Sequence, residues 1–186
     1  MEPWQRVDIA SEDDARRRLS ASCGSSTWVE RMMQRRPFGS TDALLAAARD
    51  EWFALGEDDW REAFRHHPKI GDREALRARS GVPAARTLRG GVVFPHTAHL
   101  SAQEQRGVSG APDHILDALA EGNRKYEDTF GFIFIVCATG KSAAEMLGLL
   151  RARLPNPPDR EIRIAASEQA KITELRLSAA GAENAE

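Results

Sequence analysis

Three polar residues are the main candidates for chemistry: His67, Glu104 and Arg176. His67 stands before Pro68, and a helix is expected to end there because proline disfavours helical geometry at the preceding residue. Carbonyl groups at a helix C-terminus favour a protonated imidazole, which can hold a carboxylate or an oxyanion and can transfer a proton to carbon. On position alone, a histidine before a proline is more often a surface residue that only ends a helix.

Glu104 belongs to the segment Ser101-Ala102-Gln103-Glu104-Gln105. Its pattern matches a capping box, in which Ser101 and Glu104 satisfy free backbone N–H groups at a helix start. Because the same N–H groups attract anions, Glu104 and Gln105 could instead face a ligand. The two interpretations are compatible if Ser101 caps the helix while Glu104 turns to the substrate.

Arg176 shares one helix face with Gln169 and Ile172, since the three are spaced by three and four residues. Ile172 indicates that this face points inward. An inward arginine is costly unless it pairs with a carboxylate or an anionic ligand. The alternative is an arginine at the edge of the core, or one paired with a nearby acidic side chain.

A metal site is not predicted. His96 and His99 are a histidine pair in a loop-rich stretch, without a cysteine or a third ligand beside them. Gly90-Gly91 lacks the lysine and the flanking pattern of a phosphate-binding loop. No serine or cysteine stands out as a nucleophile.

The bulk properties are those of one soluble domain spanning residues 1–186. The chain has 41% hydrophobic residues and a net charge of −2, with 26 basic and 28 acidic residues. This balance gives no electrostatic support for nucleic-acid binding. No apolar stretch approaches the roughly 20 residues that span a bilayer, and the first residues do not resemble a signal peptide. We therefore expect a cytoplasmic protein without membrane association, with Cys23 and Cys137 reduced.

The periodicity predicts an all-α fold, a single-domain helical bundle of about eight or nine helices. Apolar residues recur at helical spacing between Pro-rich or Gly-rich breaks, whereas residues 71–100 have the composition of a long loop. The segment 132–138 is ambiguous, because its β-branched and aromatic content favours a strand that would have no partner. We interpret it as a buried helical segment, and the tail 179–186 as frayed. Helix starts are predicted at Ser11, Thr41, Ser101 and Ser142, and a last helix is predicted over about 159–178.

Four segments together resemble one family, the 2-oxo-4-hydroxy-4-carboxy-5-ureidoimidazoline (OHCU) decarboxylases. Each segment alone is a weak signal, but the four occur in the right order with compatible spacing. The resemblance extends over nearly the whole chain, from Trp28 to Leu177. The four segments are His67-Pro68-Lys69-Ile70-Gly71, Ser101 to Gln105, Asn123 to Ile135 and Glu168 to Leu177.

The resemblance implies an all-helical enzyme, commonly a homodimer, that needs no metal or organic cofactor. It implies conversion of OHCU, a late product of urate oxidation, to (S)-allantoin and carbon dioxide. The family's catalytic histidine matches His67, its acidic partner matches Glu104 and its late arginine matches Arg176. On this basis we interpret His67 as the general acid. The positions expected to contact the substrate are Pro68, Ser101, Gln105, Asn123, Phe134, Ile135, Val136, Cys137 and Ala138, the last five through backbone groups.

One position departs from the family pattern, because many members have proline where this chain has Ile133. A proline there would remove a backbone donor, so the local shape is expected to differ. Two alternatives to OHCU decarboxylation stay open: a divergent member acting on another ureido or oxo acid, and a non-catalytic helical interaction module. Retention of His67, Glu104 and Arg176 together argues against the second.

Overall fold

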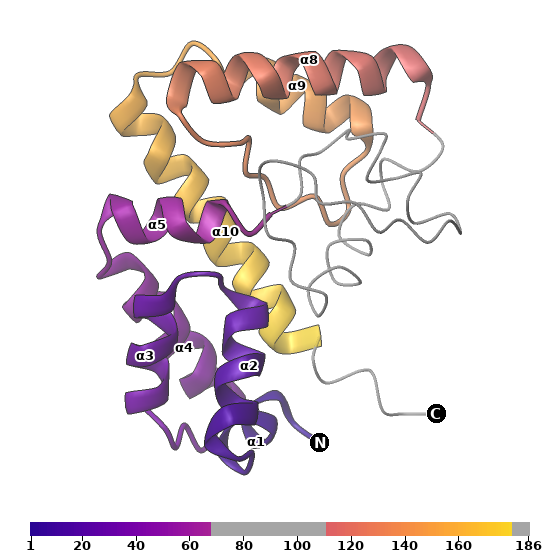
Figure 1. Cartoon of the computed structure of the whole chain (residues 1–186). Helices are drawn as coiled ribbons and strands as arrows, with labels where there is room; N and C mark the ends of the chain where they lie inside the picture. Colours follow the sequence, from indigo (N-terminus) through magenta and orange to yellow (C-terminus); the bar gives the residue numbers. More distant parts are fainter. Residues whose placement is uncertain (68–110, 180–186) are drawn as a thin grey trace, which may run out of the picture. The chain divides into compact units, whose positions relative to one another are not determined.

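The structure, a computed structural model, describes residues 1–67 and 111–179. Within these ranges the regular secondary structure consists of α-helices, which confirms the all-α fold class (Figure 1). Eight helices lie in these ranges. They are α1 (Pro3–Asp8), α2 (Glu12–Ser22), α3 (Ser26–Gln34), α4 (Thr41–Phe53), α5 (Glu57–Phe64), α8 (Asp113–Phe130), α9 (Ala143–Arg153) and α10 (Pro158–Ala179).

The chain divides into two compact units. The first comprises residues 1–64 and 166–186, and the second comprises residues 65–165. The boundary between them falls inside α10, which contributes its first turns to the second unit and the remainder to the first.

Serine side chains begin three helices of the first unit. The hydroxyl oxygens of Ser11, Ser25 and Ser40 accept hydrogen bonds from backbone N–H groups three residues later, at 3.2, 3.3 and 3.1 Å. Each bond satisfies a donor that the first turn of a helix leaves free. The helix start predicted at Ser11 is therefore confirmed, and α4 begins at Thr41 as expected.

Two buried tryptophans tie the helices of the first unit together. The indole N–H of Trp28, on α3, donates to the Ala48 carbonyl oxygen of α4 at 2.9 Å. The indole N–H of Trp52, on α4, donates to the Ala166 carbonyl oxygen of α10 at 2.8 Å. Both rings thus combine a large apolar contact with a satisfied polar group.

The large apolar side chains of α4 do not all face the core. Leu44, Ala48 and Trp52 are buried, but Phe53 is 47% exposed. Successive residues of a helix point about 100° apart, so Trp52 and Phe53 cannot both face the core squarely.

In the second unit α8 packs against α9, and α8 has a buried apolar face. Leu119, Tyr126 and Phe130 are buried along it. The two helices approach closely at Gly122, where a Cβ atom would lie 2.7 Å from a methyl carbon of Leu150. The helix start predicted at Ser142 is also confirmed, because a capping box formed by Ser142 and Glu145 opens α9.

The segment 132–138 is not a helix, so that expectation was wrong. It is buried as expected except at Ile133, which is half-buried, but it has neither helical nor strand structure. Gly131, at a φ of 73°, adopts the left-handed conformation that ends α8, and this conformation favours glycine. Side chains then bind carbonyl groups of the segment, and β-branched and aromatic residues have little preference for a helix.

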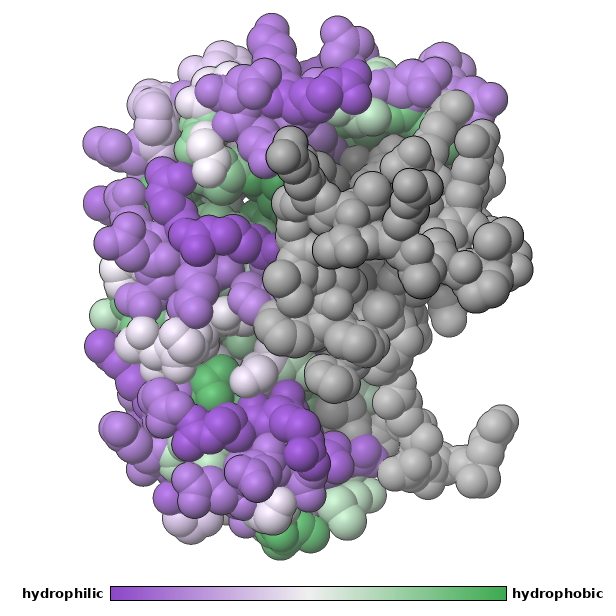
Figure 2. All heavy atoms as spheres, in the orientation of Figure 1, coloured by the Kyte–Doolittle hydropathy of each residue, from purple (hydrophilic) through white to green (hydrophobic). Residues whose placement is uncertain are grey.

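Hydrophilic side chains cover much of the surface visible in Figure 2, with scattered apolar residues among them. Of the helices in the described ranges, none is long and apolar enough to cross a membrane.

Candidate active site

His67 lies just beyond α5, which ends at Phe64, and its side chain is half-buried. The predicted end of a helix near this histidine is thus confirmed. Pro68, Ser101, Glu104 and Gln105 lie outside the described residues, as do His96, His99 and the tail from residue 180.

The residues from Phe134 to Ala138 form a continuous buried stretch. Each of the five is less than a tenth exposed. Two of its backbone carbonyl oxygens accept hydrogen bonds from side chains. Ile135 accepts from Nη1 of Arg153 at 2.8 Å, and Cys137 accepts from Nζ of Lys141 at 2.7 Å. The path of this backbone is therefore held by cationic side chains instead of by a regular ladder of hydrogen bonds.

Aromatic rings cover the same segment from α8. The ring of Tyr126 meets the rings of Phe132 and Phe134 edge to face, with centroids 5.7 and 5.3 Å apart. Phe130 lies closer, at 4.6 Å from Tyr126. Such contacts fix ring orientation as well as burying apolar area.

Asn123 lies one turn before Tyr126 on α8 and is buried. Its Nδ2 donates to the Leu119 carbonyl oxygen of the preceding turn at 3.1 Å. This bond fixes the side chain against its own helix, and contact of Asn123 with a substrate stays a prediction.

Arg176 lies on the face of α10 that the sequence predicted to be inward. Gln169, Ile172 and Arg176 are all buried, so that prediction is confirmed. Nη1 of Arg176 donates to the Ala21 carbonyl oxygen, near the C-terminus of α2, at 3.5 Å. Carbonyls at a helix C-terminus attract a cation, which helps to offset the burial of the guanidinium.

The thiol of Cys23 is buried in this part of the first unit. Burial raises its pKa from 9.0 to about 12, although hydrogen bonds from Ser25 and Thr173 and the charge of Arg176 act in the opposite direction. The thiol therefore stays protonated at neutral pH. Neither Cys23 nor Cys137 forms a disulfide, as expected.

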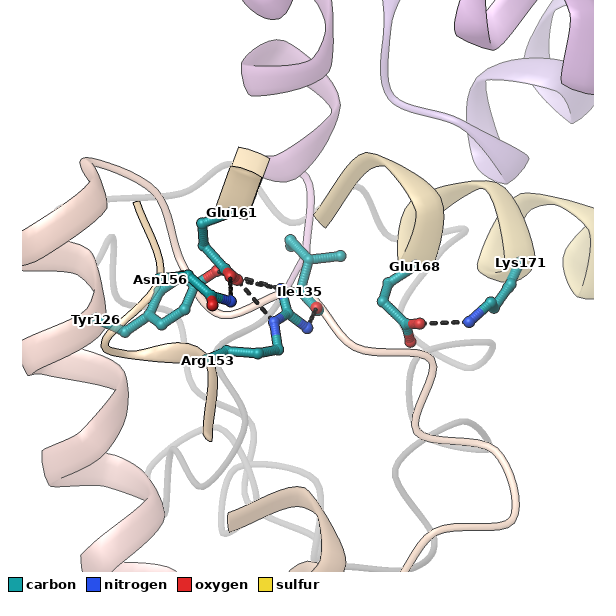
Figure 3. Close-up of polar contacts among 7 residues, drawn as sticks. All are labelled: Tyr126, Ile135, Arg153, Asn156, Glu161, Glu168 and Lys171. Carbon is teal, nitrogen blue, oxygen red and sulfur yellow. Dashed lines mark hydrogen bonds and ion pairs between the residues drawn. The ribbon is translucent and has the colours of Figure 1, made fainter. Parts of the chain in front are cut away.

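The second unit holds a buried polar network that the sequence did not predict. It comprises Tyr126 of α8, Arg153 of α9, Asn156 of the following turn and Glu161 of α10 (Figure 3). Arg153 and Glu161 were missed because a basic residue in the last turn of a helix and an acidic residue in the first turn are ordinary surface features. The weak available signal was Tyr126 on an apolar helix face.

The candidate residues are distributed over both units. His67, Asn123 and the segment 134–138 belong to the second unit, and Arg176 belongs to the first. In the described ranges no group of three His, Cys, Asp or Glu side chains is arranged to hold a metal ion. These features define an all-helical protein with buried arginines, a half-buried histidine after a helix end and a buried irregular segment held by side chains.

Sequence comparison places the chain in a family. Residues 9–178 match the family described as OHCU decarboxylase, and the chain belongs to that family. It is 39% identical over 157 residues to the uric acid degradation bifunctional protein TTL of Arabidopsis thaliana, a match covering 84% of this chain and 44% of the relative. It is 25% identical over 154 residues to the OHCU decarboxylase of Haloferax volcanii, covering 82% of this chain and 80% of that one.

The fold agrees with this assignment. A crystal structure of an OHCU decarboxylase in the presence of (S)-allantoin superimposes with a TM-score of 0.65 at 36% sequence identity, covering 85% of this chain and 92% of the other. The chain spans less than half the length of the Arabidopsis thaliana relative and 31% of the Amia calva OHCU decarboxylase, with which it shares 42% identity over 55 residues.

Proposed function

We propose that this chain decarboxylates OHCU to (S)-allantoin and carbon dioxide during urate breakdown. The observation that carries the proposal is membership of the OHCU decarboxylase family over residues 9–178. The similarity at 36% identity to an OHCU decarboxylase crystallised with (S)-allantoin supports it.

The reaction needs little from the protein beyond positioning and a proton. When carbon dioxide leaves, the bond between the ring carbon and the carboxylate breaks. The adjacent C=N bond of the ring accepts the electron pair, so the substrate provides its own electron sink. The protein must orient the carboxylate, stabilise the developing charge and deliver a proton to one face of the ring.

In this proposal His67 is the general acid that protonates carbon. It is half-buried, so it can be reached by a substrate while being partly shielded from water. Glu104 would hydrogen-bond the ureido or ring N–H groups, and Arg176 would anchor an anionic edge or position Glu104. Backbone groups of Phe134 to Ala138 would line the ring, with Pro68, Ser101, Gln105 and Asn123 as further contacts.

The proposed enzyme needs no metal or organic cofactor. We further propose one catalytic domain over residues 1–186, assembled as a homodimer in the cytoplasm. Light scattering after size-exclusion chromatography measures the assembly directly, and a monomer at micromolar concentration would contradict it. Unchanged turnover after treatment with EDTA and dialysis is expected if no metal takes part.

The test of the role of His67 is the variant His67→Asn, with His66→Asn as its matched control. Loss of a general acid typically lowers the rate by about 10²- to 10⁴-fold. We expect kcat of His67→Asn to fall by that amount while its far-UV circular dichroism stays native. His66 is a matched control because it is also half-buried and directly adjacent to His67. His66→Asn is expected to keep kcat within about threefold of the wild type. Equal losses in both variants would contradict the assignment.

The pH dependence gives a second test, because only the protonated imidazole can donate. Above the pKa of His67 in the complex, kcat should fall tenfold for each pH unit. A kcat that rises with pH over the same range would assign His67 as a base instead.

A further inference from the structure

The carboxylate of Glu161 is completely buried and accepts hydrogen bonds on both oxygens. Oε1 accepts from Nε of Arg153 at 2.7 Å and from the hydroxyl of Tyr126. Oε2 accepts from Nδ2 of Asn156 at 2.7 Å. Figure 3 shows Glu161 at the centre of these contacts.

The guanidinium of Arg153 also joins Glu161 to the backbone of the 134–138 segment. Nη1 donates to the Ile135 carbonyl oxygen at 2.8 Å, and Nη2 lies 2.6 Å from Oε1 of Glu161. The central carbon of the guanidinium lies 4.6 Å from the ring centroid of Phe134. Arg153 therefore contacts two residues of the 134–138 segment, the backbone of Ile135 and the side chain of Phe134.

The hydroxyl of Tyr126 is held in its protonated form. Burial raises its pKa well above the ordinary value, and hydrogen bonding to Glu161 acts in the same direction. The Tyr126 hydroxyl therefore keeps its proton and donates a hydrogen bond to Glu161. Through these contacts α8, α9 and α10 each supply one side chain to the network.

A buried ion pair is an expensive way to gain stability. Desolvation offsets much of the attraction, and apolar side chains of similar volume often stabilise a core as well or better. What an apolar replacement could not provide is a fixed donor for the Ile135 carbonyl. A guanidinium held by a carboxylate provides one, because its N–H groups diverge in a rigid plane.

We propose that Arg153, held in place by Glu161, is a positioning residue for the decarboxylase. It fixes the backbone of residues 134–138 in the path that meets the substrate. The inference rests on the proposed function, in which that backbone lines the ring, and adds residues that do not themselves touch substrate. The same network implies that Asn156 acts on Arg153 through Glu161. Tyr126 acts both through Glu161 and directly, because its hydroxyl also accepts from Nη2 of Arg153 at 3.2 Å and its ring contacts the ring of Phe134.

The test compares Arg153→Lys with two other variants of the full-length protein. A lysine keeps the positive charge, but a single ammonium cannot reproduce the forked contacts with Glu161 and Ile135. Tyr126→Phe removes one hydroxyl and retains the ring. Leu150→Ala is the matched control, since Leu150 is buried on the same helix but belongs to neither the network nor the segment.

All variants are assayed with freshly prepared OHCU at a temperature where circular dichroism shows them folded. Small displacements of a positioning group typically cost up to about 100-fold in rate. We expect Arg153→Lys to raise KM about 10- to 100-fold, with kcat changed less than KM and the pH dependence of kcat unaltered. Tyr126→Phe should raise KM about 2- to 10-fold. The inhibition constant of (S)-allantoin should increase in parallel with KM.

Leu150→Ala should lower the unfolding midpoint and leave KM within about twofold of the wild type. If Arg153→Lys and Tyr126→Phe keep the wild-type KM, or if Leu150→Ala raises KM equally, the network is purely structural and the inference is overturned. Tyr126→Phe carries the test alone if Arg153→Lys does not fold. A wild-type protein that does not turn over OHCU refutes the proposed function, and the positioning role falls with it.

Discussion

The close approach of α8 and α9 at Gly122 predicts a substitution whose effect changes sign with its background. A Cβ at this position would lie 2.7 and 3.2 Å from the two methyl carbons of Leu150. Because Leu150 is fully buried, its side chain has little room to move, and such overpacking costs roughly 1–3 kcal/mol. Alanine exceeds glycine in helix preference by about 1 kcal/mol. Gly122→Ala should therefore lower the free energy of unfolding by about 0–2 kcal/mol.

Removing the side chain of Leu150 should reverse that sign. Leu150→Ala alone is expected to cost about 2–5 kcal/mol, because it leaves a cavity in the core. In that background the new Cβ no longer meets the methyl groups. Gly122→Ala should then raise the free energy of unfolding by about 1 kcal/mol, the full difference in helix preference.

Gly148 is the matched control, since it lies inside α9, is exposed and has nothing within 4 Å of a Cβ. Gly148→Ala should raise the free energy of unfolding by about 0.5–1 kcal/mol. Urea titrations of the wild type, both single variants at 122 and 150 and their double variant form a complete cycle. If Gly122→Ala stabilises the wild type as much as Gly148→Ala does, the described packing of α8 on α9 is wrong.

Two further predictions concern the first unit. Because burial raises the pKa of Cys23 to about 12 from 9.0, the unfolded chain loses this proton first. Urea titrations should then show the wild type losing stability relative to Cys23→Ala between pH 9 and pH 12, by up to about 1.4 kcal/mol per pH unit; a constant difference would contradict it. Trp52→Phe removes the 2.8 Å bond to Ala166 and should cost about 1–3 kcal/mol in the same assay. Trp60→Phe removes a half-buried hydrogen bond of 3.1 Å and should lower the free energy of unfolding by less than Trp52→Phe does. Equal losses of unfolding free energy in the two variants would contradict this prediction.

The helix boundaries could be predicted because local chemistry sets them. Ser11 and the capping box at Ser142 satisfy backbone donors within a single turn, and a short stretch of sequence contains every partner. The inward face of Arg176 was predictable for a similar reason. Its spacing from Gln169 and Ile172 defines one side of a helix, and all three residues are buried.

The segment 132–138 could not be predicted from its own residues. Its conformation depends on Arg153 and Lys141, which bind its carbonyl groups from outside the segment. Hydrophobic periodicity contains no information about such partners. The burial of Arg153 was not predicted either, because an arginine in the last turn of a helix usually lies in solvent.

The candidate site was likewise only partly predictable from the residues themselves. Identification of His67, Glu104 and Arg176 as a set came from the family resemblance, since spacing alone left each with an ordinary structural interpretation. Burial of Asn123 and of Phe134 to Ala138 is now established. Their contact with a substrate, like that of the residues outside the described ranges, stays a prediction.

The most direct test of the proposed function is the stereochemical course of OHCU decay with this protein. Freshly generated OHCU is mixed with the wild-type protein and with His67→Asn, and circular dichroism follows the allantoin that forms. Unassisted protonation in water favours neither face of the ring, so an enzyme is recognised by an excess of the (S) product. We predict rapid formation of (S)-allantoin with the wild type and only the slow background reaction with His67→Asn. A wild-type trace indistinguishable from the reaction without protein would contradict the assignment of this chain as an OHCU decarboxylase.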